Sequence, residues 1–175
     1  MGEQASKYII SDESIRWKGH ILHRIQAVKS FDRVKEGDFG GWIENEHNLA
    51  QDGNCWILGE AKVFGCARVS EDARISGSAM VYDFATVSGD AKITDFAEIY
   101  DNARVYESAT ISDKAKIYGF AEVYGEAKVF NMARVFDRAM IFDAARVHKN
   151  ARIYYDSRIF FDEDITIAVG MRGML

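Results

Sequence analysis

An alanine recurs at every sixth residue from Ala61 to Ala151, sixteen times without interruption. Two residues after each alanine stands a valine or an isoleucine, as in Ala61-Lys62-Val63. A period of six fits neither an α-helix, with about 3.6 residues per turn, nor a plain alternating strand, because the pattern restarts in every repeat. The sequence therefore predicts that each hexad forms a short strand and a corner, with Ala and Val or Ile pointing inward.

The residue two positions after each Val or Ile supports this division. Of the eighteen such residues from Gly59 to Phe161, thirteen are Gly, Asp or Asn. These residue types tolerate left-handed backbone or hydrogen-bond to their own main chain, so they turn a strand at low cost. Three hexads then close one triangular coil, and successive coils should stack about 4.8 Å apart.

The repeat has a counterpart among known proteins. An aliphatic residue followed four positions later by a small one, as in Val63 and Ala67, resembles the hexapeptide-repeat superfamily, the trimeric LpxA-like proteins. The stretch 121–125, Ala-Glu-Val-Tyr-Gly, is most similar to the YdcK-like branch of bacterial and phage repeat proteins. The resemblance implies an all-β fold, a single-stranded left-handed parallel β-helix of about six coils. The left hand is implied by the family alone, because general rules favour right-handed crossovers.

The first 54 residues follow a different pattern. Apolar runs at 8–10 and 21–28 predict strands, and residues 37–56 are similar to the stretch that precedes the repeats in YdcK-like proteins. The Gly40-Gly41 pair predicts main chain packed closely against a large neighbour. Because a solenoid needs an atypical unit over its first coil, we expect a β-rich cap at 1–54, the β-helix at 55–165 and a C-terminal cap or tail at 166–175.

Composition narrows the classes of partner. The chain has 22 Lys and Arg against 27 Asp and Glu and no block of basic residues, so we expect no nucleic-acid binding through phosphates. The recurring cations Lys116, Arg134 and Arg152 are expected on a solvated face of mixed charge. No apolar run approaches the roughly 18 residues of a membrane span. With two cysteines and no secretory signal before Lys7, we expect a cytoplasmic protein of a bacterial cell or a phage-infected host.

Aromatic residues recur when every third hexad is compared. The residue after the inward Val or Ile is aromatic on one whole face and on half of a second, and strand alternation points it outward. The candidate interface or binding residues are Phe64, Tyr82, Tyr100, Tyr118, Phe136 and Tyr154 on the first face, and Tyr106, Tyr124, Phe142 and Phe160 on the second. Two compatible interpretations stay open: stacking that stabilises the coils, and an apolar strip that forms an interface.

His148 is the candidate catalytic residue, as the single histidine of the repeats. The resemblance implies this role, because many hexapeptide-repeat proteins are trimeric acyltransferases that bind acyl-coenzyme A between subunits and use a histidine base. No residue is inserted between Ala61 and Ala151, however, to form the loop that shapes such a pocket. His20 and His23 are three apart on a predicted strand and so face opposite sides. We expect no metal and no cofactor.

The sequence thus favours a non-catalytic β-helical scaffold or binding protein of bacterial or phage type, acting through its outer aromatic faces. Its partner would be another protein, further copies of itself in a dimer or trimer, or both. One version, by analogy alone, is an inhibitor of a host enzyme. The alternative is an acetyl-coenzyme A-dependent acyltransferase of the hexapeptide-repeat class.

Overall fold

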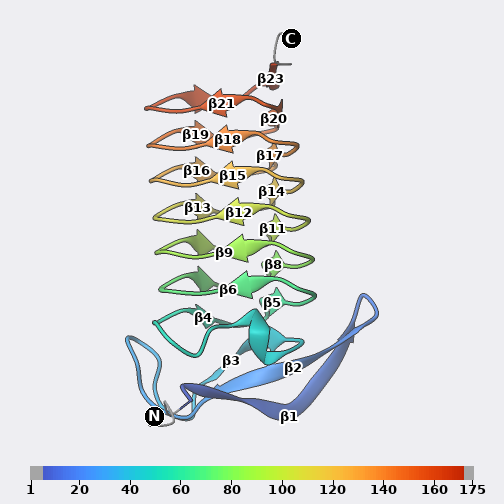
Figure 1. Cartoon of the computed structure of the whole chain (residues 1–175), viewed down its shortest axis with the longest axis vertical. Coiled ribbons are helices and arrows are strands. Elements are labelled where there is room, and N and C mark those ends of the chain that lie inside the picture. Colours follow the sequence, from blue (N-terminus) through green and yellow to red (C-terminus); the bar gives the residue numbers. More distant parts are fainter. Residues whose placement is uncertain (1–5, 172–175) are drawn as a thin grey trace.

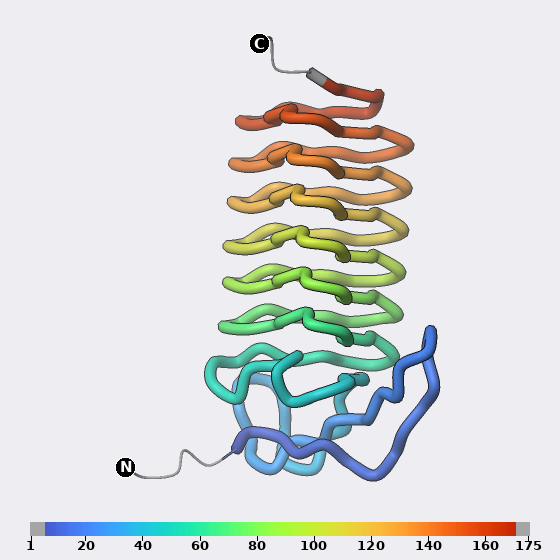
Figure 2. The backbone as a smooth tube through the Cα atoms, turned by 45° about the vertical axis from the view of Figure 1, so that its right-hand side comes forward, coloured from blue at the N-terminus to red at the C-terminus, as the bar shows by residue number. Residues whose placement is uncertain are grey.

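The chain forms a β-solenoid in the computed structural model, which describes residues 6–171 (Figure 1). Most hexads contain a two-residue strand, which pairs in parallel with the strand eighteen residues further along the chain, as Lys92 does with Thr110. The smooth trace in Figure 2 shows these coils stacked from the N-terminal to the C-terminal end. The predicted all-β repeat fold is confirmed, while the left hand of the coil stays a prediction.

Three sheets line the solenoid. The largest, here called the ladder sheet, has ten strands. Their bounds are β1 (Tyr8–Trp17), β2 (His20–Ala27), β3 (Phe39–Ile43), β5 (Lys62–Val63), β8 (Met80–Val81), β11 (Glu98–Ile99), β14 (Lys116–Ile117), β17 (Arg134–Val135), β20 (Arg152–Tyr155) and β23 (Val169–Met171). The hairpin β1–β2 and strand β3 pair antiparallel, and β3 begins the parallel series.

The other two sheets are parallel throughout. The seven-stranded sheet contains β4 (Trp56–Ile57), β7 (Arg74–Ile75), β10 (Lys92–Ile93), β13 (Thr110–Ile111), β16 (Lys128–Val129), β19 (Arg146–Val147) and β22 (Asp164–Ile165). The six-stranded sheet contains β6 (Arg68–Val69), β9 (Thr86–Val87), β12 (Arg104–Val105), β15 (Glu122–Val123), β18 (Met140–Ile141) and β21 (Arg158–Ile159). A short 3-10 helix, η1, spans Glu46–Asn48.

The interior follows the hexad. Every alanine of the frame from Ala61 to Ala151 is fully buried. The Val or Ile two residues after each alanine is at most 1% exposed. Small Ala beside branched Val or Ile fills the narrow prism without the strain that larger side chains would cause. The inward frame predicted from the sequence is confirmed.

The corners adopt the predicted left-handed backbone. All eighteen corner residues from Gly59 to Phe161 have φ between +55° and +69°. Many corner carboxylates also accept a hydrogen bond from the corner N–H of the next coil, as Asp95 does from Asp113 at 3.2 Å and Asp113 from Asn131 at 2.8 Å. Several acidic side chains therefore have a structural role at the corners.

The coil register begins before residue 55. Trp42 and Ile43 pair with Lys62 and Val63 in parallel, and Leu49 bridges to Val69. Gly41-Trp42-Ile43 has the small-x-aliphatic order of a hexad, which explains why it can stack on the repeats. The seven-stranded sheet accordingly indicates about seven coils rather than the expected six.

The Gly40-Gly41 pair lies where the N-terminal segment meets the first coil. A Cβ on Gly40 would lie 2.6 Å from Cγ1 of Ile25, and one on Gly41 would lie 2.4 Å from Cγ2 of Ile57. The close main-chain packing predicted for this pair is confirmed.

Lys7 and Tyr8 close the end of the first coil. The Lys7 Nζ atom is buried and donates to the carbonyl oxygens of Asp52 and Cys55, both at 3.0 Å. The Tyr8 hydroxyl donates to the Leu49 carbonyl at 2.7 Å, and burial raises the pKa of that hydroxyl. The division of the chain into cap, helix and tail stays a prediction, and its last residues, 172–175, lie outside the described part of the chain.

Candidate interaction surface: the aromatic ladders

The first predicted aromatic row is a continuous stack on the ladder sheet. We call it the first ladder; its members are Phe64, Tyr82, Tyr100, Tyr118, Phe136 and Tyr154. Neighbouring ring centroids are 5.0–5.5 Å apart, and neighbouring planes differ by 1–11°. Since each ring covers the face of the next, the edges of the rings point to the outside. The rings therefore stack as the first interpretation requires. That the stack stabilises the coils and that it forms an interface stay predictions.

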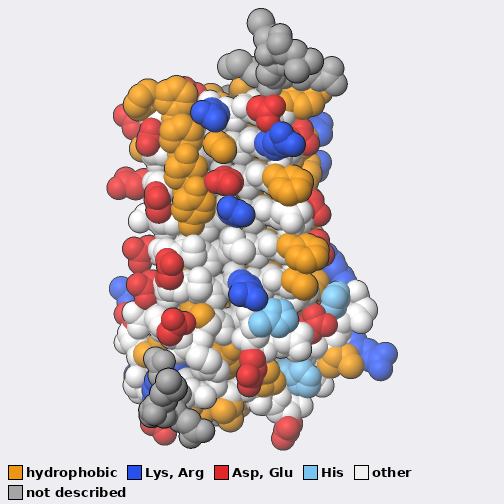
Figure 3. All heavy atoms as spheres, viewed as in Figure 1, with side chains coloured by type: hydrophobic (Ala, Val, Ile, Leu, Met, Phe, Trp, Pro, Cys, Tyr) orange, Lys and Arg blue, Asp and Glu red, His pale blue; other side chains and the backbone are white. Residues whose placement is uncertain are grey.

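The second ladder lies on the six-stranded sheet. It consists of Tyr106, Tyr124, Phe142 and Phe160, with centroids 4.9–5.5 Å apart. The corresponding positions in earlier coils are Ser70 and Ser88, so the stack begins halfway along the solenoid. Figure 3 shows the result as a column of hydrophobic side chains over the upper coils of this face.

The hairpin β1–β2 covers the beginning of the first ladder. Phe64 is only 3% exposed and packs against Leu22 and Trp42, and the ring centroid of His20 lies 4.9 Å from that of Phe64. The Nζ atom of Lys18 lies 4.7 Å from the ring centroid of Tyr82. Phe64, an interface candidate from the sequence, thus lies beneath the chain's own hairpin, whereas the later rings are half-buried.

Glu98 organises the middle of the first ladder. Its carboxylate accepts a hydrogen bond from the Tyr82 hydroxyl at 3.1 Å and lies 2.7 Å from Lys116 Nζ. Burial acts to raise the pKa of Glu98, but Lys116 and Tyr82 together outweigh burial and hold the pKa below its usual value. Burial, with Tyr118 and Glu98 nearby, raises the pKa of Tyr100 to about 12. At neutral pH this phenol is therefore a neutral donor.

The second ladder has a similar arrangement. The Tyr106 hydroxyl donates to Glu122 at 3.0 Å, and Arg104 lies 3.9 Å from the same carboxylate. Burial and the hydrogen bond to Glu122 raise the pKa of Tyr106. Each ladder thus combines stacked rings with a carboxylate that holds one hydroxyl in place.

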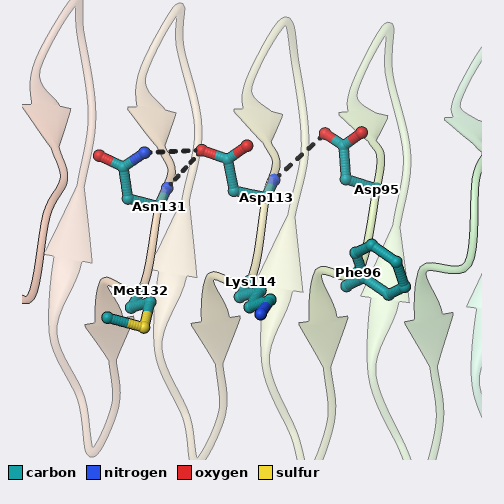
Figure 4. Close-up of a pocket in the computed structure, with 6 residues that line it drawn as sticks. All are labelled: Asp95, Phe96, Asp113, Lys114, Asn131 and Met132. Atoms are coloured by element: carbon teal, nitrogen blue, oxygen red, sulfur yellow. Dashed lines mark hydrogen bonds between the residues drawn. The ribbon is translucent and has the colours of Figure 1, made fainter.

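Sequence reasoning missed a further group of apolar side chains at the corners. Phe84, Phe96, Phe120 and Met132 are 55–63% exposed. All four occupy the last position of a hexad, which our sorting by faces did not consider. Figure 4 shows one such row, in which Phe96, Lys114 and Met132 lie beside the hydrogen-bonded row of Asp95, Asp113 and Asn131. These six residues line a shallow depression of about 430 Å³.

His148 lies on the seven-stranded sheet, away from the other histidines. Its ring stacks on Phe130 with centroids 4.7 Å apart, and its Nε2 atom lies 2.5 Å from a carboxylate oxygen of Asp164. A carboxylate in this position can orient an imidazole. Within residues 6–171 we find no group of three or more His, Cys, Asp and Glu side chains that could hold a metal ion. The same residues include no helix that could cross a membrane.

The repeats match known proteins over short stretches. Residues 97–113, which span β11 to β13, match the family model described as YdcK Beta solenoid repeat. A curated relative, the uncharacterized acetyltransferase YdcK of Escherichia coli (strain K12), is 46% identical over 54 residues. That match covers 30% of this chain and 17% of the relative, so the chain spans less than a fifth of the relative's length. Together with the stacked coils, the two matches make the repeat region of this chain a YdcK-like β-solenoid.

Proposed function

We propose that this chain is a non-catalytic binding or scaffold protein whose partner contacts the open part of the first ladder. The observation that carries the proposal is the packing of the hairpin β1–β2 on the first two rings of the ladder, Phe64 and Tyr82, through aromatic and cationic side chains. We call each ring of the ladder a rung, and these two the covered rungs. The open rungs Tyr100, Tyr118, Phe136 and Tyr154 present the same kind of surface without that cover.

The physical properties of the ladder support this role. Stacked rings on a solenoid are held rigidly by their neighbours, so a partner that covers them orders few side chains on binding. Aromatic residues in such clusters tend to dominate the energy of an interface. A scaffold, a homo-oligomer and an inhibitor that occupies a host enzyme would all use this surface in the same way.

The test replaces two adjacent rings by charges. In the Tyr100→Lys/Tyr118→Lys variant we expect the coils to stay folded, because both side chains point outward, and partner capture or self-association to be lost. The matched control is Thr94→Lys/Ser112→Lys, which changes the same hexad position on the seven-stranded sheet. Far-UV circular dichroism measures the fold, and light scattering with a pull-down measures association. A folded ladder variant that keeps every partner would place the interface elsewhere.

Acetyl transfer is the second candidate function, and two observations favour it. The curated relative is named an acetyltransferase, and His148 is paired with Asp164 as a general base would be. Calorimetric titration of the wild type and of His148→Ala with acetyl-coenzyme A tests it. Saturable binding of acetyl-coenzyme A by the wild type, with acetyl transfer that is lost in His148→Ala, would show that the chain is an enzyme and not a binding protein.

A further inference from the structure

A row of cations runs beside the open end of the first ladder. The second residue of each ladder-sheet hexad points outward, and in the later coils these residues are Lys116, Arg134 and Arg152. Lys116 is paired with Glu98, but within residues 6–171 no carboxylate lies in salt-bridge distance of Arg134 or Arg152. Both arginines are exposed, and the guanidinium of Arg152 lies 5.7 Å from the ring centroid of Phe136. The chain therefore combines a net charge of −5 with a basic, aromatic strip.

The strip is bounded by two carboxylates at the corner that follows this sheet. Asp101 and Asp137 alternate there with Gly119 and Tyr155, from whose N–H groups they accept hydrogen bonds at 3.1 Å and 2.9 Å. A wide polyanion such as a nucleic-acid duplex would bring phosphates onto these carboxylates. Bases of a single strand would need exposed ring faces, and the stacked rings present their edges instead. The strip therefore suits one narrow acidic segment of a protein.

The spacing of the rungs selects the shape of that segment. Successive coils are about 4.8 Å apart. Neighbouring side chains on one face of an α-helix, at i and i+3 or i+4, are about 5–6 Å apart, whereas those on one face of a strand are about 6.6 Å apart. Over the two steps from Tyr118 to Tyr154 a helix accumulates roughly 1 Å of mismatch and a strand roughly 4 Å.

Building on the proposed function, we infer that the open end of the first ladder binds an acidic amphipathic α-helix that lies along the solenoid axis. Carboxylates spaced by three or four residues on the helix pair with Arg134 and Arg152. An adjacent apolar row of the helix covers the ring edges of Tyr118, Phe136 and Tyr154.

The probe is a labelled synthetic helix of about 18 residues, long enough to form a helix in solution. It carries Glu in one row and Leu in the adjacent row, and fluorescence anisotropy at two salt concentrations measures its binding. The test variant is Arg134→Glu/Arg152→Glu. The matched control is Lys128→Glu/Arg146→Glu on the seven-stranded sheet, where Arg146 lies 5.5 Å from the ring of Phe130 much as Arg152 does from Phe136.

We expect the test variant to bind the acidic helix at least about tenfold more weakly than the wild type, and the control to change Kd by less than about twofold. A second peptide with Lys in place of Glu should bind the test variant more tightly than it binds the wild type. Circular dichroism confirms that all variants are folded.

Three outcomes would overturn the inference: no saturable binding of the acidic helix to the wild type, equal loss in test and control variants, or tighter binding of a single-stranded oligonucleotide than of the helix. The same variants distinguish this inference from the proposed function. If Tyr100→Lys/Tyr118→Lys loses its natural partner and Arg134→Glu/Arg152→Glu keeps it, the ladder is the binding surface and the acidic helix is not its ligand. If both variants keep the partner, the proposed function itself is wrong.

Discussion

Two segments of the ladder sheet have almost the same sequence and very different surroundings. Lys62-Val63-Phe64 and Arg134-Val135-Phe136 each place a cation, an inward valine and a ladder ring in the same hexad positions. Lys62 and Phe64 are 7% and 3% exposed under the hairpin, whereas Arg134 is exposed and Phe136 half-buried. The hexad thus determines which way a side chain points, and the element that lies over the sheet determines whether solvent or a partner can reach it.

The two cations show what this difference does to a charge. Lys62 Nζ donates to the carbonyl of Glu60 at 2.8 Å and lies 4.6 Å from the ring of Trp17. Burial lowers the pKa of Lys62, because the amine loses water on that side. Arg134 is exposed to solvent, so it remains available to a carboxylate of a partner.

The packing of the interior should be the same in the coil under the hairpin and in the open coils. A buried charge is the strongest test of that packing. Ala103→Asp places an unpaired carboxylate in a prism without space for water, so we expect about 3–5 kcal/mol of destabilisation. Arg104→Asp, at the neighbouring outward position, loses an exposed ion pair and faces Glu122 across the sheet, so it should cost no more than about 1 kcal/mol. Chemical denaturation measures both. Equal losses at the two positions would contradict the assigned frame.

The two ladder phenylalanines provide the sharpest test of the covered and open ends. Phe64→Ala should cost about 3 kcal/mol, because it leaves a cavity between Leu22 and Trp42. Phe136→Ala removes a half-buried ring and mainly stacking, so about 1 kcal/mol is expected. Urea unfolding of the two variants compares them. Similar losses would mean that the hairpin does not protect the first rung.

A buried lysine distinguishes the covered end further. Lys7→Met removes the donor to the carbonyl oxygens of Asp52 and Cys55, and we expect a loss of about 2 kcal/mol. Lys128→Met, on an exposed position of the open coils, serves as the control and should be nearly neutral. Thermal unfolding followed by circular dichroism measures both. A Lys7→Met variant as stable as the wild type would show that the first coil does not depend on this contact.

The smallest effect concerns pH. The folded pKa of Glu98 lies below its ordinary value of 4.5, so its pairing with Lys116 and Tyr82 stabilises the chain fully above that value. This contribution is lost as pH falls through the lower, folded pKa. Glu98→Gln should therefore cost about 0.5 kcal/mol at pH 7 and progressively less as the pH falls through the folded pKa of Glu98. A difference in stability that does not shrink on acidification would assign the effect to packing instead of charge.

Much of the fold follows from the hexad because its constraints are local. Ala103 and Val105 are inward for the same steric reason as every other pair in the frame, and Asp95 and Asp113 tolerate the positive φ that a corner needs. The stacking of Tyr100 on Tyr118 follows as well, since equal positions one coil apart must lie above each other. The corner residues Phe96 and Met132 could have been found by the same argument applied to the last hexad position.

The sequence by itself therefore determined the coil, its interior and the direction of the ladders, because each depends on a repeating pattern of small, branched and turn-forming residues. Only the tertiary structure decided where the coils begin and which rungs are covered. Those features depend on single contacts that non-repeating segments make with the coils, such as Leu22 with Phe64 and Lys7 with Cys55. No period in the sequence encodes such contacts. They arise because the apolar side chains of the hairpin, such as Leu22, gain most by packing on the one end of the ladder that lies within their reach.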